Sequence, residues 1–276
     1  MSYSDFLATA LEAARKAGPV IKAAFLNRTL QGTLDLKSNT SDLVTATDKA
    51  VEALVFAHIR EKYPDHKFIG EETYDGATTE LTNDLTWCVD PVDGTTNFVH
   101  GFPYVCISIA LLKNAQAVVG VVLNPILGEC FYAAEGSGAF MEAMDGTVHS
   151  LPLYGVQPWK GLSASLVATE WGYERDARLD SKLKTLDSVL KAPTRGVRSL
   201  GSAALEACYV ARGTFDLYWE AGVHMWDVAA AAIIIRESGG EIANFVVVRD
   251  ESGKEVLDLK QRKFLFVRAV EGVLRR

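Results

Sequence analysis

The feature that most constrains this chain is the segment WCVDPVDGTTNFVHGFP at residues 87–103. A mostly apolar run at residues 85–89 leads directly into two aspartates, a glycine and two threonines, which are Asp90, Asp93, Gly94, Thr95 and Thr96. Carboxylates and hydroxyls thus follow the point where a buried strand is predicted to end. Carboxylates three residues apart can converge on a hard cation, while the glycine lets the backbone turn and leaves the threonine N–H groups free for an anion. The segment therefore predicts a metal ion with a phosphate beside it.

Acid-rich turns are common, so other motifs have to be weighed against this interpretation. An EF-hand loop counted from Asp90 needs oxygen ligands at its third and fifth positions and a glutamate at its twelfth, where this chain has Val92, Gly94 and Gly101. Aspartyl-phosphate phosphatases separate two aspartates by a single residue, whereas Asp90 and Asp93 are separated by two. A hairpin turn whose aspartates cap backbone N–H groups remains an alternative on this segment alone.

The composition is that of a globular protein with an acidic balance. The chain has 276 residues and a formal net charge of -7, which argues against nucleic acid and anionic membranes as partners. A phosphorylated substrate then needs local positive charge, which clustered acids supply only by holding metal ions. No stretch approaches the roughly 18 apolar residues of a membrane span, and residues 1–18 lack the pattern of a signal peptide. We therefore expect a cytoplasmic protein.

The four cysteines are spaced too widely for a zinc knuckle and lie in apolar contexts. We expect them to be reduced core residues.

Further acids lie where predicted strands and helices begin or end. Residues 67–70 are typical of a short strand. Glu71 follows the end of this strand, just as Asp90 and Asp93 follow the apolar run of the central segment. Asp48 and Asp227 fall in the first turns of predicted helices. Each acid also has a simpler explanation, since glutamates in loops are usually solvated and aspartates in a first helical turn favour the helix dipole. Acids at several strand ends nevertheless indicate one shared site.

The remaining pattern predicts alternating strands and helices with no linker between the two halves of the chain. Helices are expected to start at the N-caps Ser4 and Thr47, with a bend at Gly18, and a helix of small residues is expected to end at Gly213. Strands are expected at residues 104–112, 116–123, 215–219 and 263–267. We expect a single domain over residues 1–276, with the metal-motif half at about 1–150 and the second half at about 151–276.

Together these motifs resemble the inositol monophosphatase family, within the lithium-sensitive, magnesium-dependent phosphatase superfamily. The matching segments are residues 42–48, 70–72, 87–103, 201–203 and 220–227, in the family's order and approximate spacing. The resemblance implies an α/β (α+β) fold, a layered αβαβα sandwich of the inositol monophosphatase and fructose-1,6-bisphosphatase type, usually paired as a homodimer. The chain after Gly240 contributes less to the resemblance.

The resemblance also implies a site residue by residue. The implied metal ligands are Glu71, Asp90, Asp93, Asp227 and the carbonyl of Val92. The implied substrate and phosphate contacts are Asp93, Gly94, Thr95, Thr96, Gly201, Ser202, Ala203, Glu220 and Asp227. Lys37 and Asp48 match positions near a third, weaker magnesium. Four carboxylates do not stay ionised together without divalent cations between them, and Mg²⁺ suits an all-oxygen site.

The implied reaction is hydrolysis of a phosphate monoester by a metal-activated water that Glu71 and Thr95 orient. The expected substrate is myo-inositol 1-phosphate. Histidinol phosphate, a sugar phosphate and a nucleotide 3′-phosphate remain alternatives for the same chemistry. A homologue that binds metal and ligand without catalysis is an alternative of a different class.

Overall fold

The structure is a computed structural model that describes residues 2–27, 35–36, 43–44, 46–76, 81–172, 175–249 and 252–271. Lys37, expected near a third metal, lies outside these residues.

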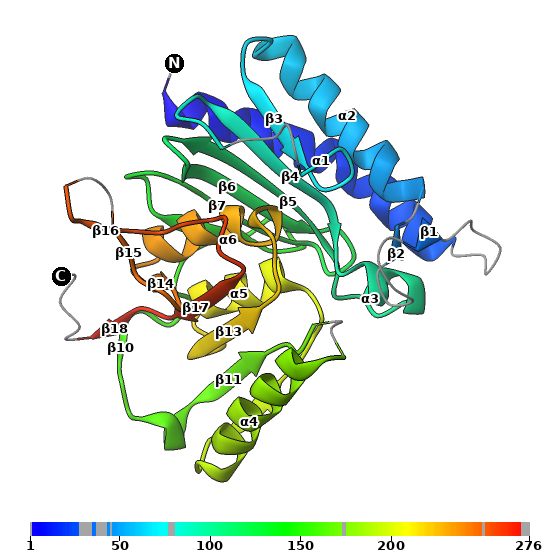
Figure 1. Cartoon of the computed structure of the whole chain (residues 1–276). Helices are drawn as coiled ribbons and strands as arrows, with labels where there is room; N and C mark the ends of the chain where they lie inside the picture. The colour runs from blue at the N-terminus through cyan, green and yellow to red at the C-terminus, as the bar shows by residue number, and fades with distance from the viewer. Residues whose placement is uncertain are drawn as a thin grey trace.

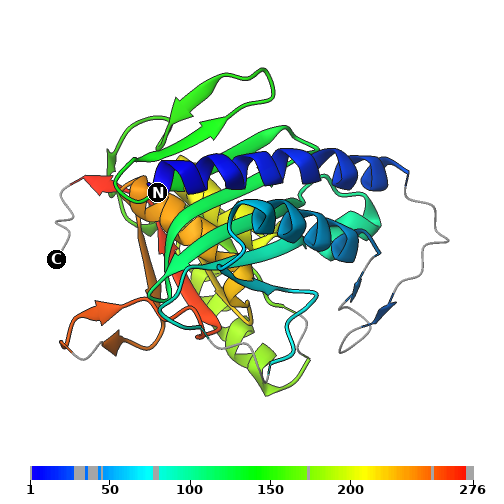
Figure 2. The same cartoon turned by 90° about the horizontal axis from the view of Figure 1, so that it is seen from above.

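Two long helices form the first layer. Helices α1 (Tyr3–Leu26) and α2 (Ala46–Lys62) lie side by side on one face of a large sheet (Figures 1 and 2). The buried face of α1 carries small and apolar side chains at helical spacing, among them Phe6, Ala10, Ala13, Ala14, Ala17 and Ile21. The predicted caps are wrong by a few residues, because Ser2 rather than Ser4 forms a capping box with Asp5, and α2 begins at Ala46, before Thr47. The helix α1 also continues through Pro19.

The second layer is a seven-stranded sheet in the order β3-β4-β5-β6-β7-β8-β9. Its strands are β3 (Lys67–Gly70), β4 (Thr86–Asp93), β5 (Cys106–Lys113), β6 (Gln116–Asn124), β7 (Glu129–Ala134), β8 (Ala139–Glu142) and β9 (Val148–Ser150). β3 pairs with β4 in parallel, and the other neighbours are antiparallel. Every residue of β4 is buried, because helices cover both faces of the sheet at this strand.

The strand β4 is longer than the sequence predicted. It continues through Asp90 to Asp93, with Asp90 opposite Ser108 and Asp93 opposite Cys106 and a shift of register between the two pairs. Pro91, which has no N–H group to donate to the ladder, lies within this irregular stretch. The two aspartates therefore stand on an irregular strand end and not in a hairpin turn.

The third layer consists of helices α5 (Ala203–Arg212) and α6 (Met225–Glu237), which pack against each other. Ten of the residues of α6 are buried, from Met225 to Ile235 with only Asp227 missing from the run, because this helix lies between two sheets (Figure 1). Ser202 caps α5 through its hydroxyl. The helix ends at Gly213, as predicted, and this glycine is in a left-handed conformation.

The fourth and fifth layers are a five-stranded sheet and helix α4 (Ala177–Lys191), which lies on its outer side (Figure 1). The sheet order is β12-β11-β13-β17-β14, with β11 (Leu166–Thr169), β12 (Gly196–Arg198), β13 (Leu217–Ala221), β14 (Glu241–Asn244) and β17 (Lys263–Val267). β13 begins two residues later than the predicted strand at 215–219. The mixed α/β layered sandwich expected from the sequence is confirmed.

Short elements complete the description. They are β1 (Asp35–Leu36), β2 (Leu43–Val44), α3 (Thr95–His100), β10 (Gln157–Pro158), the 3-10 helix η1 (Leu162–Ala164), β15 (Val248–Arg249), β16 (Glu255–Val256) and β18 (Val270–Glu271). The four cysteines are free and buried, as expected. In the part of the chain that the structure describes, no helix is long and apolar enough to cross a membrane. One hydrophobic cluster contains side chains from both halves of the chain, for example Cys106 and Ala204.

Candidate active site

The end of β4 carries two buried carboxylates. Asp90 is 1% exposed, and its Oδ1 accepts a hydrogen bond from the N–H of Val92 at 3.1 Å. Asp93 Oδ2 accepts hydrogen bonds from the hydroxyl of Ser202 at 2.7 Å and from the N–H of Ala204 at 2.8 Å. Asp93 is therefore bound to the start of α5, and the first half of the chain meets the second at this carboxylate.

Glu71 and Asp227 reach the same region from other elements. β3 and β4 are parallel, so Glu71, which follows β3, lies beside the end of β4, and its N–H donates to the Val89 carbonyl at 3.1 Å. Asp227 stands in the first turn of α6, where its Oδ2 accepts from the N–H of His224 at 2.6 Å. Ser108, opposite Asp90 on β5, donates to the Trp226 carbonyl at 3.1 Å and so joins the start of α6 to the sheet.

The pKa shifts show that these acids act on one another. Burial raises the pKa of Asp90 well above its ordinary value, and Glu71, Asp93, Asp227 and Asp48 raise it further through their charges. Burial likewise raises the pKa of Asp93 to about 6, against the hydrogen bonds from Ser202 and Ala204. The pKa of Asp227 rises through burial first, then through Asp93 and Glu71. Protons or cations are needed to neutralise such a group.

The donor set fits a hard divalent cation by its chemistry. Asp90 and Asp93 supply buried carboxylate oxygens and Asp227 a partly buried one beside Glu71, and Mg²⁺ prefers oxygen ligands of this kind. In the described ranges, no three Asp, Glu, His or Cys side chains lie in coordination geometry around one point. The case for a metal therefore rests on the donor set and on the mutual repulsion of its charges.

A tight turn places two threonines next to the carboxylates. Gly94 adopts a left-handed conformation with φ 90°, and a Cβ there would lie 2.9 Å from the Tyr104 carbonyl oxygen and 3.2 Å from that of Gly201, so only glycine fits. The short helix α3 starts at once with Thr95 and Thr96. The Thr95 hydroxyl donates to the carbonyl of Val92 at 3.3 Å. The backbone thus brings the expected carbonyl ligand and the expected catalytic threonine together.

Asn97 joins the Gly94 turn to the second half of the chain through hydrogen bonds. Its Nδ2 donates to the carbonyl oxygens of Tyr104 at 2.9 Å, Leu200 at 2.7 Å and Gly201 at 3.2 Å. A Cβ on Gly201, whose φ is +77°, would lie 3.1 Å from the Asn97 amide. Asn97 belongs to the central segment at residues 87–103, but no local sequence pattern indicates this role.

Glu220 occupies a second group of buried acids beside Asp93. It lies on β13, accepts a hydrogen bond from the hydroxyl of Tyr218, and is 8% exposed. Its pKa is raised to about 8, by burial first and also by the charges of Glu170 and Asp93, while Tyr218 and Lys182 act in the opposite direction.

Sequence reasoning missed Glu170 and Glu206, whose pKa values are also raised, by burial first. Glu170 follows the buried strand β11, and its Oε1 accepts from the N–H of Gly201 at 2.8 Å. An acid directly after a strand was the signal that could have found Glu170, whereas Glu206 stands in a helix of small residues and gives no such signal.

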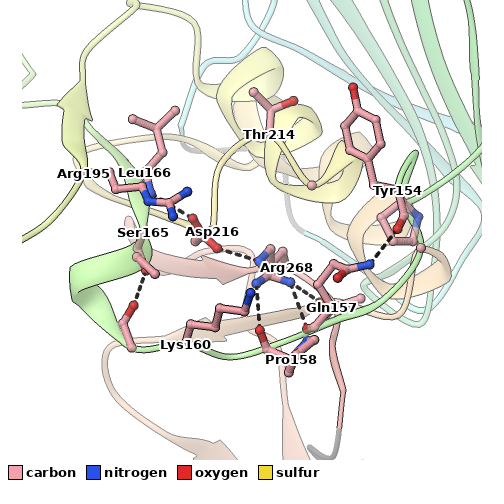
Figure 3. A pocket seen from close by; sticks show the side chains of 16 residues that line it. Tyr154, Gln157, Pro158, Lys160, Ser165, Leu166, Arg195, Thr214, Asp216 and Arg268 are labelled. Atoms are coloured by element: carbon pink, nitrogen blue, oxygen red, sulfur yellow. Dashed lines mark hydrogen bonds and ion pairs between the residues drawn. The ribbon is translucent and has the colours of Figure 1, made fainter.

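A separate pocket of about 430 Å³ lies at the starts of β11 and β13, away from the strand ends that carry Glu170 and Glu220 (Figure 3). Asp216, which precedes β13, pairs with Arg268 at 2.7 Å and accepts from the N–H of Leu166 at 2.8 Å. Lys160 and Arg195 add positive charge to its lining. Because β11 and β13 are parallel, their starts at this pocket lie away from their ends near Glu170 and Glu220. The pocket is therefore distinct from the acid site.

Comparisons with known proteins agree with this geometry. The sequence model of the inositol monophosphatase family matches residues 2–262. Inositol monophosphatase 2 of Saccharomyces cerevisiae is 42% identical over 260 residues, covering 92% of this chain and 84% of that protein. Inositol monophosphatase 2 of Solanum lycopersicum is 44% identical over 263 residues, covering 94% and 92%. The solved inositol monophosphatase of Anabaena is similar with a TM-score of 0.76 and 32% identity, covering 97% of this chain and 92% of that chain.

The layered fold and the group of buried acids between its sheets define a phosphoric monoester hydrolase of the metal-dependent class. The chain belongs to the inositol monophosphatase family.

Proposed function

We propose that this protein hydrolyses myo-inositol 1-phosphate to myo-inositol and phosphate with Mg²⁺ as its cofactor. The observation that carries the proposal is the group of acids at the ends of β3 and β4 and the start of α6, whose charges raise one another's pKa beside the Gly94 turn. Such a group combines an oxygen-rich cation site with backbone N–H groups suited to a phosphate. The relatives' names support inositol phosphate as the substrate.

The metal would be held by Glu71, Asp90, Asp93 and Asp227 and by the carbonyl of Val92. Bound Mg²⁺ would activate a water for in-line attack and stabilise the leaving alkoxide. Glu71 and Thr95 would orient that water, and the Thr95 hydroxyl lies 3.3 Å from the Val92 carbonyl that is proposed as a metal ligand. Asp48 is close enough to raise the pKa of Asp90, which supports its expected place near a third metal.

The remaining predicted residues would bind the substrate. The Gly94, Thr95 and Thr96 N–H groups hold the phosphate oxygens. Gly201 and Ser202 are joined to the first half of the chain by hydrogen bonds with Asn97 and Asp93, and we expect Gly201, Ser202, Ala203 and Glu220 to contact the substrate from that side.

A nucleotide monophosphate is the second candidate substrate. One solved Staphylococcus aureus relative, 25% identical with a TM-score of 0.73, is described as bound to inositol monophosphate. Another, 26% identical with a TM-score of 0.71, is described as bound to 2′-AMP. Histidinol phosphate and sugar phosphates stay in the comparison set because they present the same phosphate group.

The same family membership supports a homodimer, inhibition by lithium and a cytoplasmic location. Sedimentation at several protein concentrations tests the dimer, and inhibition by Li⁺ at saturating substrate tests lithium sensitivity.

Phosphate release tests the function directly. Metal-free protein should be inactive on myo-inositol 1-phosphate and should recover activity when Mg²⁺ is restored. Parallel assays with nucleotide, sugar and histidinol monophosphates rank the substrates by kcat/KM. Full activity in excess chelator would contradict the proposed metal dependence. A higher kcat/KM on another monoester would contradict myo-inositol 1-phosphate as the substrate.

A further inference from the structure

Glu52 is a buried acid close to the site that neither the sequence motifs nor the proposed mechanism uses. It lies on α2, one helical turn after Asp48, and is 2% exposed. Its Oε2 accepts a hydrogen bond from the N–H of Glu72 at 2.8 Å. Glu72 directly follows Glu71, so the Glu52 carboxylate contacts the backbone on one side of a proposed metal ligand.

The same carboxylate also contacts the residue on the other side of Glu71. A Cβ on Gly70 would lie 2.2 Å from Glu52 Oε2 and 2.3 Å from Glu52 Cδ. Gly70 does not have a positive φ, so its backbone would accept alanine, and the Glu52 carboxylate is what excludes a side chain there. Glu52 therefore packs against both neighbours of Glu71.

The third constraint on Glu71 comes from the sheet. Its own N–H donates to the Val89 carbonyl at 3.1 Å, one residue before Asp90. Glu71 is thus held between the end of β4 and the Glu52 carboxylate, and the direction of its side chain depends on both.

The second carboxylate oxygen of Glu52 is buried at a cost in folding free energy. Oε1 is buried and has no hydrogen-bond partner in the part of the chain that the structure describes. A buried carboxylate oxygen without a partner costs stability, whereas an apolar side chain would remove that cost but leave the Glu72 N–H without its acceptor. The carboxylate therefore holds the backbone at Glu72 and does not only fill space.

We propose that Glu52 is a positioning residue that fixes the backbone of Glu71 and so directs the Glu71 carboxylate toward Asp90. The inference rests on the proposed function, because Glu71 is taken there as a metal ligand. Glu52 itself contacts neither substrate nor metal. Its removal should weaken Mg²⁺ binding while the fold persists.

The first experiment compares Glu52→Ala and Glu52→Gln with Glu237→Ala. Glu237 is the control, since its carboxylate also accepts from backbone N–H groups, those of Gly136 at 3.0 Å and Gly138 at 2.8 Å, but at the far end of α6 from Asp227. Mg²⁺ binding is measured by calorimetry and by the Mg²⁺-induced rise in Tm. Glu52→Ala should lose affinity about 10- to 100-fold, the loss typical of groups that orient metal ligands. Glu52→Gln keeps an acceptor for Glu72 and should stay near wild type, as should Glu237→Ala.

A double-mutant cycle tests the contact with Gly70. Gly70→Ala should displace the Glu52 carboxylate and weaken Mg²⁺ binding to a similar extent. Combining Gly70→Ala with Glu52→Ala should then be no worse than Glu52→Ala alone. Additive losses would overturn the inference. A harmless Gly70→Ala would overturn it too, even if Glu52→Ala failed to fold.

Hydrogen exchange in metal-free protein separates the possible failures. The Glu72 amide should exchange faster in Glu52→Ala than in wild type and in Glu237→Ala, whether or not metal binds. Faster exchange with unchanged Mg²⁺ affinity would overturn the positioning role alone. A wild-type protein that does not bind Mg²⁺ would overturn the proposed function, and this inference with it.

Discussion

At the scale of single residues, the site is governed by the cost of burying several negative charges together. Asp90 illustrates this cost, because burial and four neighbouring acids all raise its pKa. In the metal-free protein these groups share protons, and a divalent cation would replace them. The acids that destabilise the empty site are therefore the same ones that would bind the metal.

Asp90→Asn separates the role of the carboxylate in metal binding from the destabilising effect of its charge. Removing this carboxylate should lower kcat on myo-inositol 1-phosphate by several orders of magnitude, because Asp90 is a proposed metal ligand whose charge interacts with all the other acids of the site. The metal-free variant should melt at the wild-type temperature or above, because its neighbours lose a repulsive charge. Turnover assays with Mg²⁺ and thermal melts by circular dichroism measure both. A variant with a tenth of normal activity would exclude a central role for Asp90.

Glu220→Gln tests substrate choice. If the Glu220 carboxylate accepts hydrogen bonds from ring hydroxyls, its loss should cost roughly 1.5–3 kcal/mol in transition-state binding, or about 10- to 150-fold in kcat/KM for myo-inositol 1-phosphate. Glycerol 2-phosphate, which lacks the ring, should be much less affected. Equal losses on both substrates would assign Glu220 to support of the metal site through Asp93. No change on either would leave it a buried partner of Tyr218.

At the scale of elements, helix α6 links the core to the site. Its first turn carries Asp227, and its middle packs on β6 at Gly120, where a Cβ would lie 2.4 Å from the Ala230 carbonyl oxygen and 2.6 Å from Ile233 Cγ2. The backbone of the helix therefore lies directly on the sheet. Glycine at this position sets the distance between two layers of the sandwich.

Gly120→Ala should push α6 away from the sheet. Overpacking of a rigid core typically costs about 1–3 kcal/mol, and we expect a loss of unfolding free energy of at least that order in urea titrations. Gly196→Ala is the control, since Gly196 is also a strand glycine without positive φ, and its new Cβ would meet only the end of the Arg198 side chain at 3.2 Å and Leu166 at 3.5 Å. Equal stability of the two variants would show that α6 and the sheet adjust to the added methyl group without a loss of unfolding free energy.

At the scale of the whole molecule, the buried acids make stability depend on pH and metal together. The pKa of Asp93 is raised to about 6 and that of Glu220 to about 8, and those of Asp90, Asp227, Glu170 and Glu206 are also raised. The folded protein thus binds protons that the unfolded chain has already released above its ordinary carboxyl values near 4. Stability should therefore fall as the pH rises from about 4 through about 8.

Melting curves in chelator and in Mg²⁺ test this linkage. In chelator, Tm should fall between neutral pH and about pH 8.5, because Glu220 and its neighbours lose their protons in the folded state over that range. In saturating Mg²⁺ the fall should be smaller, since the cation stabilises the ionised carboxylates and binds only the folded chain. A metal-free protein that becomes more stable over this pH range would contradict the arrangement of charges described above.

The sequence by itself determined that acids adjoin the Gly94 turn and that strands and helices alternate, because strand ends and turns depend on local side-chain chemistry. Asp90, Asp93 and Gly94 stand in one short segment, Glu71 and Asp227 stand at other predicted strand and helix ends, and the resemblance implied that these acids are metal ligands.

Only the tertiary structure decided how far β4 runs beyond Pro91, where the first helices are capped, and which acids are buried together. Glu52 looks like any helical glutamate until α2 packs against β3, and Asn97 like any loop residue until the 200–201 backbone lies against it. Strand register, burial and the mutual approach of charges depend on contacts between residues far apart in the chain, which no local pattern specifies.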